Sequence, residues 1–104
     1  ITHIPPGANG FDGSNFWHPD YTQTFVNEVV KYSSIIKLNI ASHTHFNDFK
    51  VFYNSSGNPV SYLRIVPSIC SNHGNYPSFE IAEVDTANDR VIKETNYYLN
   101  LAAA

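Results

Sequence analysis

Two histidines separated by one residue, His43 and His45, follow a short apolar stretch. On an extended backbone, residues two apart point to the same side, so both imidazoles would face one ligand. A neutral imidazole binds zinc, iron, nickel or copper. The pair therefore predicts a metal site or, as the simpler alternative, two solvent-facing side chains at the end of a strand.

A third histidine lies in a segment with a restricted backbone. His3 is followed by Ile4, Pro5, Pro6 and Gly7. The two prolines fix φ and remove backbone donors, which makes a rigid support for a ligand. The same five residues also fit an ordinary turn, and both interpretations stay open.

The remaining nucleophilic and imidazole side chains have weaker signals. His18 precedes an expected helix and His73 lies in a loop rich in Gly and Asn, so we expect structural or surface roles for both. Cys70 is the single cysteine, which excludes an intrachain disulfide. Because it follows an apolar strand, we expect a buried, inert thiol.

One helix and several strands must position these side chains. Residues 1–18 are rich in Gly, Pro, Asn and Asp and predict a long loop. A helix is expected over residues 20–33, with Asp20 as its cap and Phe25, Val29 and Tyr32 on one face. Alternating residues predict a strand at 36–40. Further strands, arranged as a mostly antiparallel β-meander, are expected at 49–54, 60–66, 78–85 and 90–101.

Length and composition limit the function classes. The 104 residues form one domain, and 42% hydrophobic with 14% charged residues is typical of a globular chain. The net charge is −3 and the basic residues are scattered, so we expect no nucleic-acid-binding surface. We expect no transmembrane segment, because the apolar runs are short. Asn54-Ser55-Ser56 matches a glycosylation sequon.

Two ordered blocks together carry a family resemblance. Thr2-His3-Ile4-Pro5-Pro6-Gly7 and Ser42-His43-Thr44-His45 are followed by an aromatic-rich strand. In these blocks the chain resembles the calcineurin-like metallophosphoesterases, most closely their acid sphingomyelinase-like branch. The resemblance extends from about residue 2 to residue 85. It implies an α/β class, as the carboxyl-terminal portion of a metallophosphoesterase α/β sandwich.

The resemblance also implies roles for three histidines. His3 and His43 would bind one metal of a pair, and His45 would bind the other. The two divalent metals, zinc in this branch, would activate water to hydrolyse a phosphodiester that is sphingomyelin-like or nucleotide-like. Thr2 and Ser42 stand where the family has glycine, and Asn47 replaces an acid. These departures concern the surroundings of the ligands more than the ligands themselves.

Several blocks of the family site are not found in the 104 residues. They are Asp-x-His, a Gly-Asp block and Gly-Asn-His, all of which precede the first block in the family. We therefore expect residues 1–101 to be the carboxyl-terminal part of a catalytic domain, and residues 102–104 to be a cloning scar. The chain alone should bind metal weakly, supply no catalytic residue and be inactive.

These expectations extend to partners and compartment. The partners would be a phosphoester substrate, the missing amino-terminal half of the domain and, through exposed strand edges, another copy of the chain. The branch implies a secreted or lysosomal location. The alternative function is a noncatalytic metal- or partner-binding module with the same fold.

Overall fold

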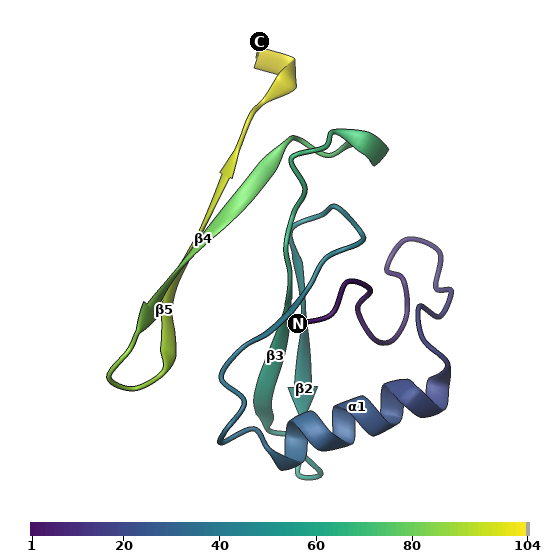
Figure 1. The fold of residues 1–104 in the computed structure, drawn as a ribbon. Helices are drawn as coiled ribbons and strands as arrows, with labels where there is room; N and C mark the ends of the chain where they lie inside the picture. The colour runs from purple at the N-terminus through teal and green to yellow at the C-terminus, as the bar shows by residue number, and fades with distance from the viewer. Residues whose placement is uncertain (104) are drawn as a thin grey trace.

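The computed structural model describes residues 1–103, which form one helix and two small sheets (Figure 1). The chain begins with a long loop, as its Gly and Pro content predicts. The elements in chain order are α1 (Pro19–Lys31), β1 (Asn39–Ala41), β2 (Asp48–Tyr53), β3 (Pro59–Ile65), η1 (Asn72–Gly74), β4 (Ser78–Asp85), β5 (Arg90–Tyr98) and η2 (Leu101–Ala103). This arrangement confirms the predicted class of one main helix followed by mostly antiparallel strands.

The first sheet has the strand order β1-β3-β2. β2 and β3 form an antiparallel hairpin, whereas β1 pairs with β3 in parallel. The sheet is therefore mixed, and β1 is not the first strand of a simple meander. Because β3 is central, two of its residues, Leu63 and Ile65, are only 1% exposed.

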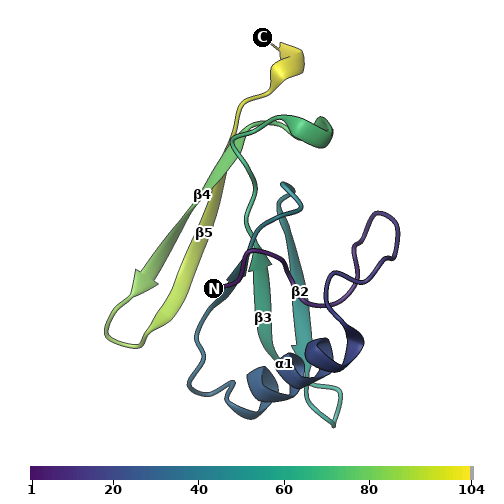
Figure 2. The same cartoon turned by 45° about the vertical axis from the view of Figure 1, so that its right-hand side comes forward.

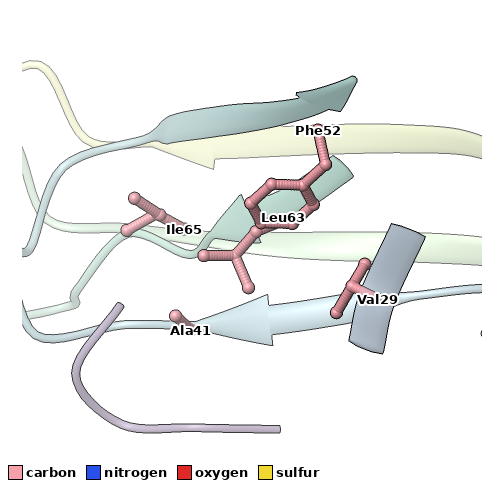
Figure 3. Close-up of a cluster of buried hydrophobic side chains, with 5 residues drawn as sticks. All are labelled: Val29, Ala41, Phe52, Leu63 and Ile65. Carbon is pink, nitrogen blue, oxygen red and sulfur yellow. The ribbon is translucent and has the colours of Figure 1, made fainter. Parts of the chain in front are cut away.

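A small apolar core holds α1 against this sheet (Figure 3). Its five members come from the helix and all three strands: Val29, Ala41, Phe52, Leu63 and Ile65. The predicted apolar helix face is largely confirmed, because Phe25, Val26 and Val30 pack against this cluster beside Val29. Tyr32 is an exception, since it lies at the helix end and is exposed.

The helix begins one residue earlier than expected and has a different cap. His18 occupies the N-cap position, and its Nδ1 accepts a hydrogen bond from the Asp20 backbone N–H at 3.4 Å. The prediction that Asp20 caps the helix is wrong. The helix starts at Pro19 because the fixed φ of proline suits the first helical position and proline has no backbone N–H to satisfy.

The strand after the helix is also shorter than predicted. β1 covers three residues, whereas alternation predicted a strand over 36–40. Ile36 instead packs against the core cluster from the loop, although it alternates with its neighbours as a strand residue would. Of the expected apolar residues only Ile36 packs against the core cluster, because the buried positions of β1 are Asn39 and Ala41 rather than Ile40.

β4 and β5 form a separate antiparallel hairpin that extends away from the first sheet (Figures 1 and 2). Polar side chains connect the two sheets. Arg64 on β3 forms a hydrogen-bonded ion pair with Glu80 on β4, with Nε at 3.0 and 2.9 Å from the two carboxylate oxygens. This bond to Glu80 is the main cause that raises the pKa of Arg64. Tyr62 donates to Glu94 at 3.3 Å.

Within residues 1–103, no helix is long and apolar enough to cross a membrane.

Candidate metal site

Backbone hydrogen bonds place His3 beside the end of β1. The Thr2 N–H donates to the Ile40 carbonyl, and the Ser42 N–H donates to the His3 carbonyl, both at 2.9 Å. The first residues thus run along the edge of β1 that does not face β3. This pairing brings two segments about 40 residues apart in sequence to the same end of the sheet.

His3 and His43 lie in direct contact at this end. Nε2 of His3 is 3.3 Å from Nδ1 of His43, and their rings meet edge to face. Two nitrogens bound about 2.0–2.1 Å from one tetrahedral zinc are about 3.3–3.4 Å apart. The observed separation therefore fits two ligands of a single metal, as it also fits one imidazole donating to the other. Both side chains are exposed, so the pair is accessible from solvent.

His45 does not join this pair. Its ring lies against that of His73, with centroids 5.6 Å apart, whereas His43 contacts His3 and Phe16. The expectation that His43 and His45 face one side of an extended strand is wrong. β1 ends at Ala41, and the backbone then turns.

Positive φ angles are the reason for this divergence. His43 has φ 74° and His45 has φ 66°, both in the left-handed region that side chains other than glycine seldom adopt. A third histidine, His73, also has φ 66°. Of the four non-glycine residues with positive φ within residues 1–103, three are thus histidines. Such backbone strain concentrates at functional sites.

The surroundings of His45 offer an unsatisfied nitrogen. Its Nδ1 is buried and has no hydrogen-bond partner among the described residues. An imidazole nitrogen in that state fits the role of a ligand to a further group, since buried polar atoms are otherwise nearly always paired. The donor set of the described chain thus fits a metal at His3 and His43, and a single ligand at His45.

No larger cluster surrounds these histidines. Within residues 1–103, no group of three or more His, Cys, Asp or Glu side chains is arranged to hold a metal ion. The acid or amide side chains next in sequence are engaged elsewhere. Asn47 accepts from the Arg64 guanidinium, and Asp48 accepts from the backbone N–H of Phe49 at 2.7 Å.

Lys50 on β2 supports the loop that carries His3. Its ammonium donates to the Pro6 carbonyl at 2.9 Å and to the Ala8 carbonyl at 2.8 Å. Burial lowers the pKa of Lys50, and the nearby Asp48 partly opposes that shift. Gly7, with φ 86°, lets the backbone turn here, and a side chain at this position would approach Lys50 Nζ to 3.3 Å.

We expect the Lys50→Ala variant to lose about 1–3 kcal/mol of unfolding free energy, because two charge-assisted hydrogen bonds to loop carbonyls disappear. Urea unfolding measures this loss, and hydrogen exchange should be faster at Gly7 and Ala8. Lys37→Ala is the matched control, since Lys37 donates to a single exposed carbonyl, that of Ser34. Equal effects of the two substitutions would contradict the supporting role of Lys50.

Sequence reasoning missed two side chains at this site, Phe16 and Lys50, whose separations in sequence from the residues that they contact give no local signal. Ser42 was noted only as a departure beside the ligands, and His73 was expected to have a structural or surface role, whereas they contact His3 and His45. The expectation for Cys70 is wrong, because its thiol is exposed in a bend after β3 rather than buried. His18 has the structural role expected for it, as a helix cap.

Comparison with known proteins agrees with the resemblance carried by the two histidine blocks. Sphingomyelin phosphodiesterase 1 from Caenorhabditis elegans is 30% identical over 110 residues, and acid sphingomyelinase-like phosphodiesterase 3b from Homo sapiens is 24% identical over 114. Cyclic GMP-AMP phosphodiesterase SMPDL3A from Homo sapiens is 27% identical over 111 residues. No family model matches the chain.

Each of these three alignments covers the whole of this chain. The chain in turn spans 18% to 25% of the length of these curated relatives. The resemblance predicted from the histidine blocks is confirmed at the level of sequence. The chain is a relative, over its whole length, of one segment of the acid sphingomyelinase-like phosphodiesterases.

Proposed function

We propose that this chain supplies three metal ligands to a two-metal phosphodiesterase. His3 Nε2 and His43 Nδ1 would hold the first metal, and His45 would contribute to the second. When bound, the two metals would polarise a phosphoryl group and lower the pKa of an attacking water. The approach of Nε2 of His3 to Nδ1 of His43, at 3.3 Å, is the observation that carries this proposal.

The substrate we propose is a phosphodiester, either sphingomyelin-like or nucleotide-like. The named relatives support both choices, since two are sphingomyelin-type phosphodiesterases and one is a cyclic GMP-AMP phosphodiesterase. The chain's own residues would fix the metal ligands, of which His3 and His43 are exposed to solvent. The choice of substrate would depend on loops elsewhere in a longer protein.

We further propose that the 104 residues are one part of the catalytic domain and are inactive alone. Two ligands on one metal and one on the other fall short of the three protein ligands usual for a catalytic zinc. Exposed apolar side chains on the hairpin, including Phe79, Ile81 and Tyr97, support a further covering partner.

Hydrolysis of bis(4-nitrophenyl) phosphate tests this function. The purified chain should show no hydrolysis above the buffer blank, with or without zinc. A longer protein that contains this chain and the rest of the domain should be active, and its activity should be lost with a chelator and in the His45→Ala variant. Zinc-dependent turnover by the 104 residues alone would contradict the claim of incompleteness, and chelator-resistant activity would contradict the metal role.

A noncatalytic binding module is the second candidate. The separation of His45 from the pair favours it, because the pair alone fits one metal and His45 faces His73 instead. In that case the longer protein would bind one zinc per chain through His3 and His43. It would hydrolyse no phosphodiester.

The same exposed apolar hairpin predicts self-association of the isolated chain. Phe79 stacks on Tyr97 and Tyr76 on Tyr98, and all four rings keep a large exposed area. We expect sedimentation velocity to show dimers or larger species that dissociate on dilution. Substituting Phe79 and Tyr97 together with serine should shift the chain toward monomer, whereas Tyr21→Ser, which removes an exposed ring from α1, should not.

A secreted or lysosomal location is also part of the proposal. The sequon residue Asn54 lies at the β2–β3 turn, where its Oδ1 accepts from the backbone N–H groups of Ser56 and Asn58 at 3.0 Å. We expect expression through a secretory pathway to give a glycan that an amidase removes and that Ser56→Ala abolishes. An unmodified secreted chain would contradict this prediction.

A further inference from the structure

Ser42 stands where the family resemblance implies glycine, and its hydroxyl makes contacts that glycine could not make. Its Oγ is 2.9 Å from Nδ1 of His3 and 3.3 Å from the His3 carbonyl oxygen. The Ser42 backbone N–H donates to the same carbonyl at 2.9 Å. The hydroxyl is thus fixed against both the ring and the backbone of one candidate ligand.

These contacts favour one tautomer of the neutral His3 ring. A carbonyl oxygen only accepts, so the Oγ contact with the His3 carbonyl requires the single hydroxyl proton of Ser42. That proton is then not available to Nδ1. Both contacts are satisfied together only when Nδ1 carries a proton and donates it to Oγ. Nε2 is then left with its lone pair.

The lone pair on Nε2 lies on the side of His3 that faces the second candidate ligand, His43. Nε2 of His3 is the nitrogen 3.3 Å from Nδ1 of His43. A hydrogen bond to the distal nitrogen fixes the tautomer and orientation of metal-binding histidines and raises their basicity. We propose that Ser42 is a positioning residue that holds His3 in the Nδ1–H tautomer, so that Nε2 is preset to bind a metal. The role of Ser42 in metal binding rests on the proposed function, whereas the tautomer of His3 can be tested without it.

Three variants separate the hydroxyl from other effects. Ser42→Ala removes Oγ but keeps the backbone bond to His3, so the local fold should persist. Ser42→Thr keeps a hydroxyl and should restore the wild-type behaviour. Ser14→Ala is the control, because the Ser14 hydroxyl donates to Asp12 in the exposed loop.

Long-range ¹H–¹⁵N NMR of the metal-free 104-residue chain gives the first readout. At a pH about two units above the ordinary histidine pKa of about 6.5, neutral rings show their tautomer directly. We expect His3 to be Nδ1–H in the wild type, Ser14→Ala and Ser42→Thr, and to lose that preference in Ser42→Ala. An Nε2–H tautomer in the wild type, or no change in Ser42→Ala, would overturn the inference.

Zinc titration gives the second readout. We expect the affinity to fall by about 10–100-fold in Ser42→Ala, as for other outer-shell partners, and to stay within about twofold in Ser42→Thr. If Ser42→Ala changes the His3 tautomer but not the zinc affinity, Ser42 does not prepare His3 for metal binding, and that part of the inference is overturned. If the wild type binds no zinc, or His3→Ala binds it equally well, the metal assignment in the proposed function fails. The NMR result then still decides the tautomer claim.

Discussion

Replacing Arg64 with alanine is expected to lower the unfolding free energy by about 3–5 kcal/mol, the usual cost of removing one partner of a buried ion pair. The Arg64 side chain is 13% exposed and the Glu80 side chain 6%. Removal of the guanidinium would leave the Glu80 carboxylate buried without its cation. Glu94, 25% exposed and 3.8 Å from Arg64 Nε, would lose the same neighbour.

The same substitution should also loosen the hairpin from the first sheet. Arg64 connects β3 with β4 and also donates to Asn47 and to the Asp48 carbonyl at the start of β2. Urea unfolding measures the loss of stability. Hydrogen exchange should become faster in β4 and β5 before it does so in the core strand β3.

Lys93→Ala is the matched control for Arg64→Ala. Lys93 pairs with Glu83 at 3.2 Å within the hairpin, but both side chains are more than half exposed, at 63% and 52%. Such exposed pairs contribute about 0–1 kcal/mol. If the two variants lose similar unfolding free energy, the Arg64–Glu80 ion pair contributes little to holding the hairpin against the first sheet.

Replacing either His3 or His43 with alanine is expected to weaken zinc binding between these two residues by more than about 100-fold. This loss is larger than the one expected when a residue that only hydrogen-bonds to a metal ligand is replaced. Each substitution removes one of the two nitrogens that lie 3.3 Å apart. The two variants should have nearly the same effect, and the double variant should lose little more. That non-additivity is expected when two residues act on one ion.

Titration of the purified chain with zinc, monitored by calorimetry, measures these affinities. His18→Asn is the control, because asparagine can still cap α1 while one imidazole is removed. It should bind zinc as the wild type does. An unchanged affinity in His43→Ala, or additive losses from the two substitutions, would show that His3 and His43 do not share a metal.

The local sequence was enough to predict the main helix, the four strands after β1 and the candidate ligands. Apolar residues at helical spacing placed α1, and alternation placed β2 to β5 close to their observed bounds. Both signals depend on periods of 3.6 and 2 residues, which the backbone geometry itself imposes. The order of the two histidine blocks pointed to His3, His43 and His45 through a family resemblance. The similarity to the curated relatives confirms that resemblance.

The helix start and β1 show where the local pattern fails. His18 rather than Asp20 caps α1, because Pro19 is suited to the first helical position. β1 keeps only two of the expected residues, 39 and 40, and extends to Ala41, because pairing with β3 determines its extent. A period of two cannot tell a paired strand from an extended loop that packs on the core.

Only the tertiary structure decided how the three histidines are grouped. His3 meets His43 because the first residues run along β1, a pairing between segments about 40 residues apart. His45 turns toward His73 because positive φ angles end the extended geometry on which alternation depends. The sequence by itself therefore identified which imidazoles are candidate metal ligands. The sheet edge and the left-handed turns decided which of them meet, since such contacts depend on long-range pairing that no local period encodes.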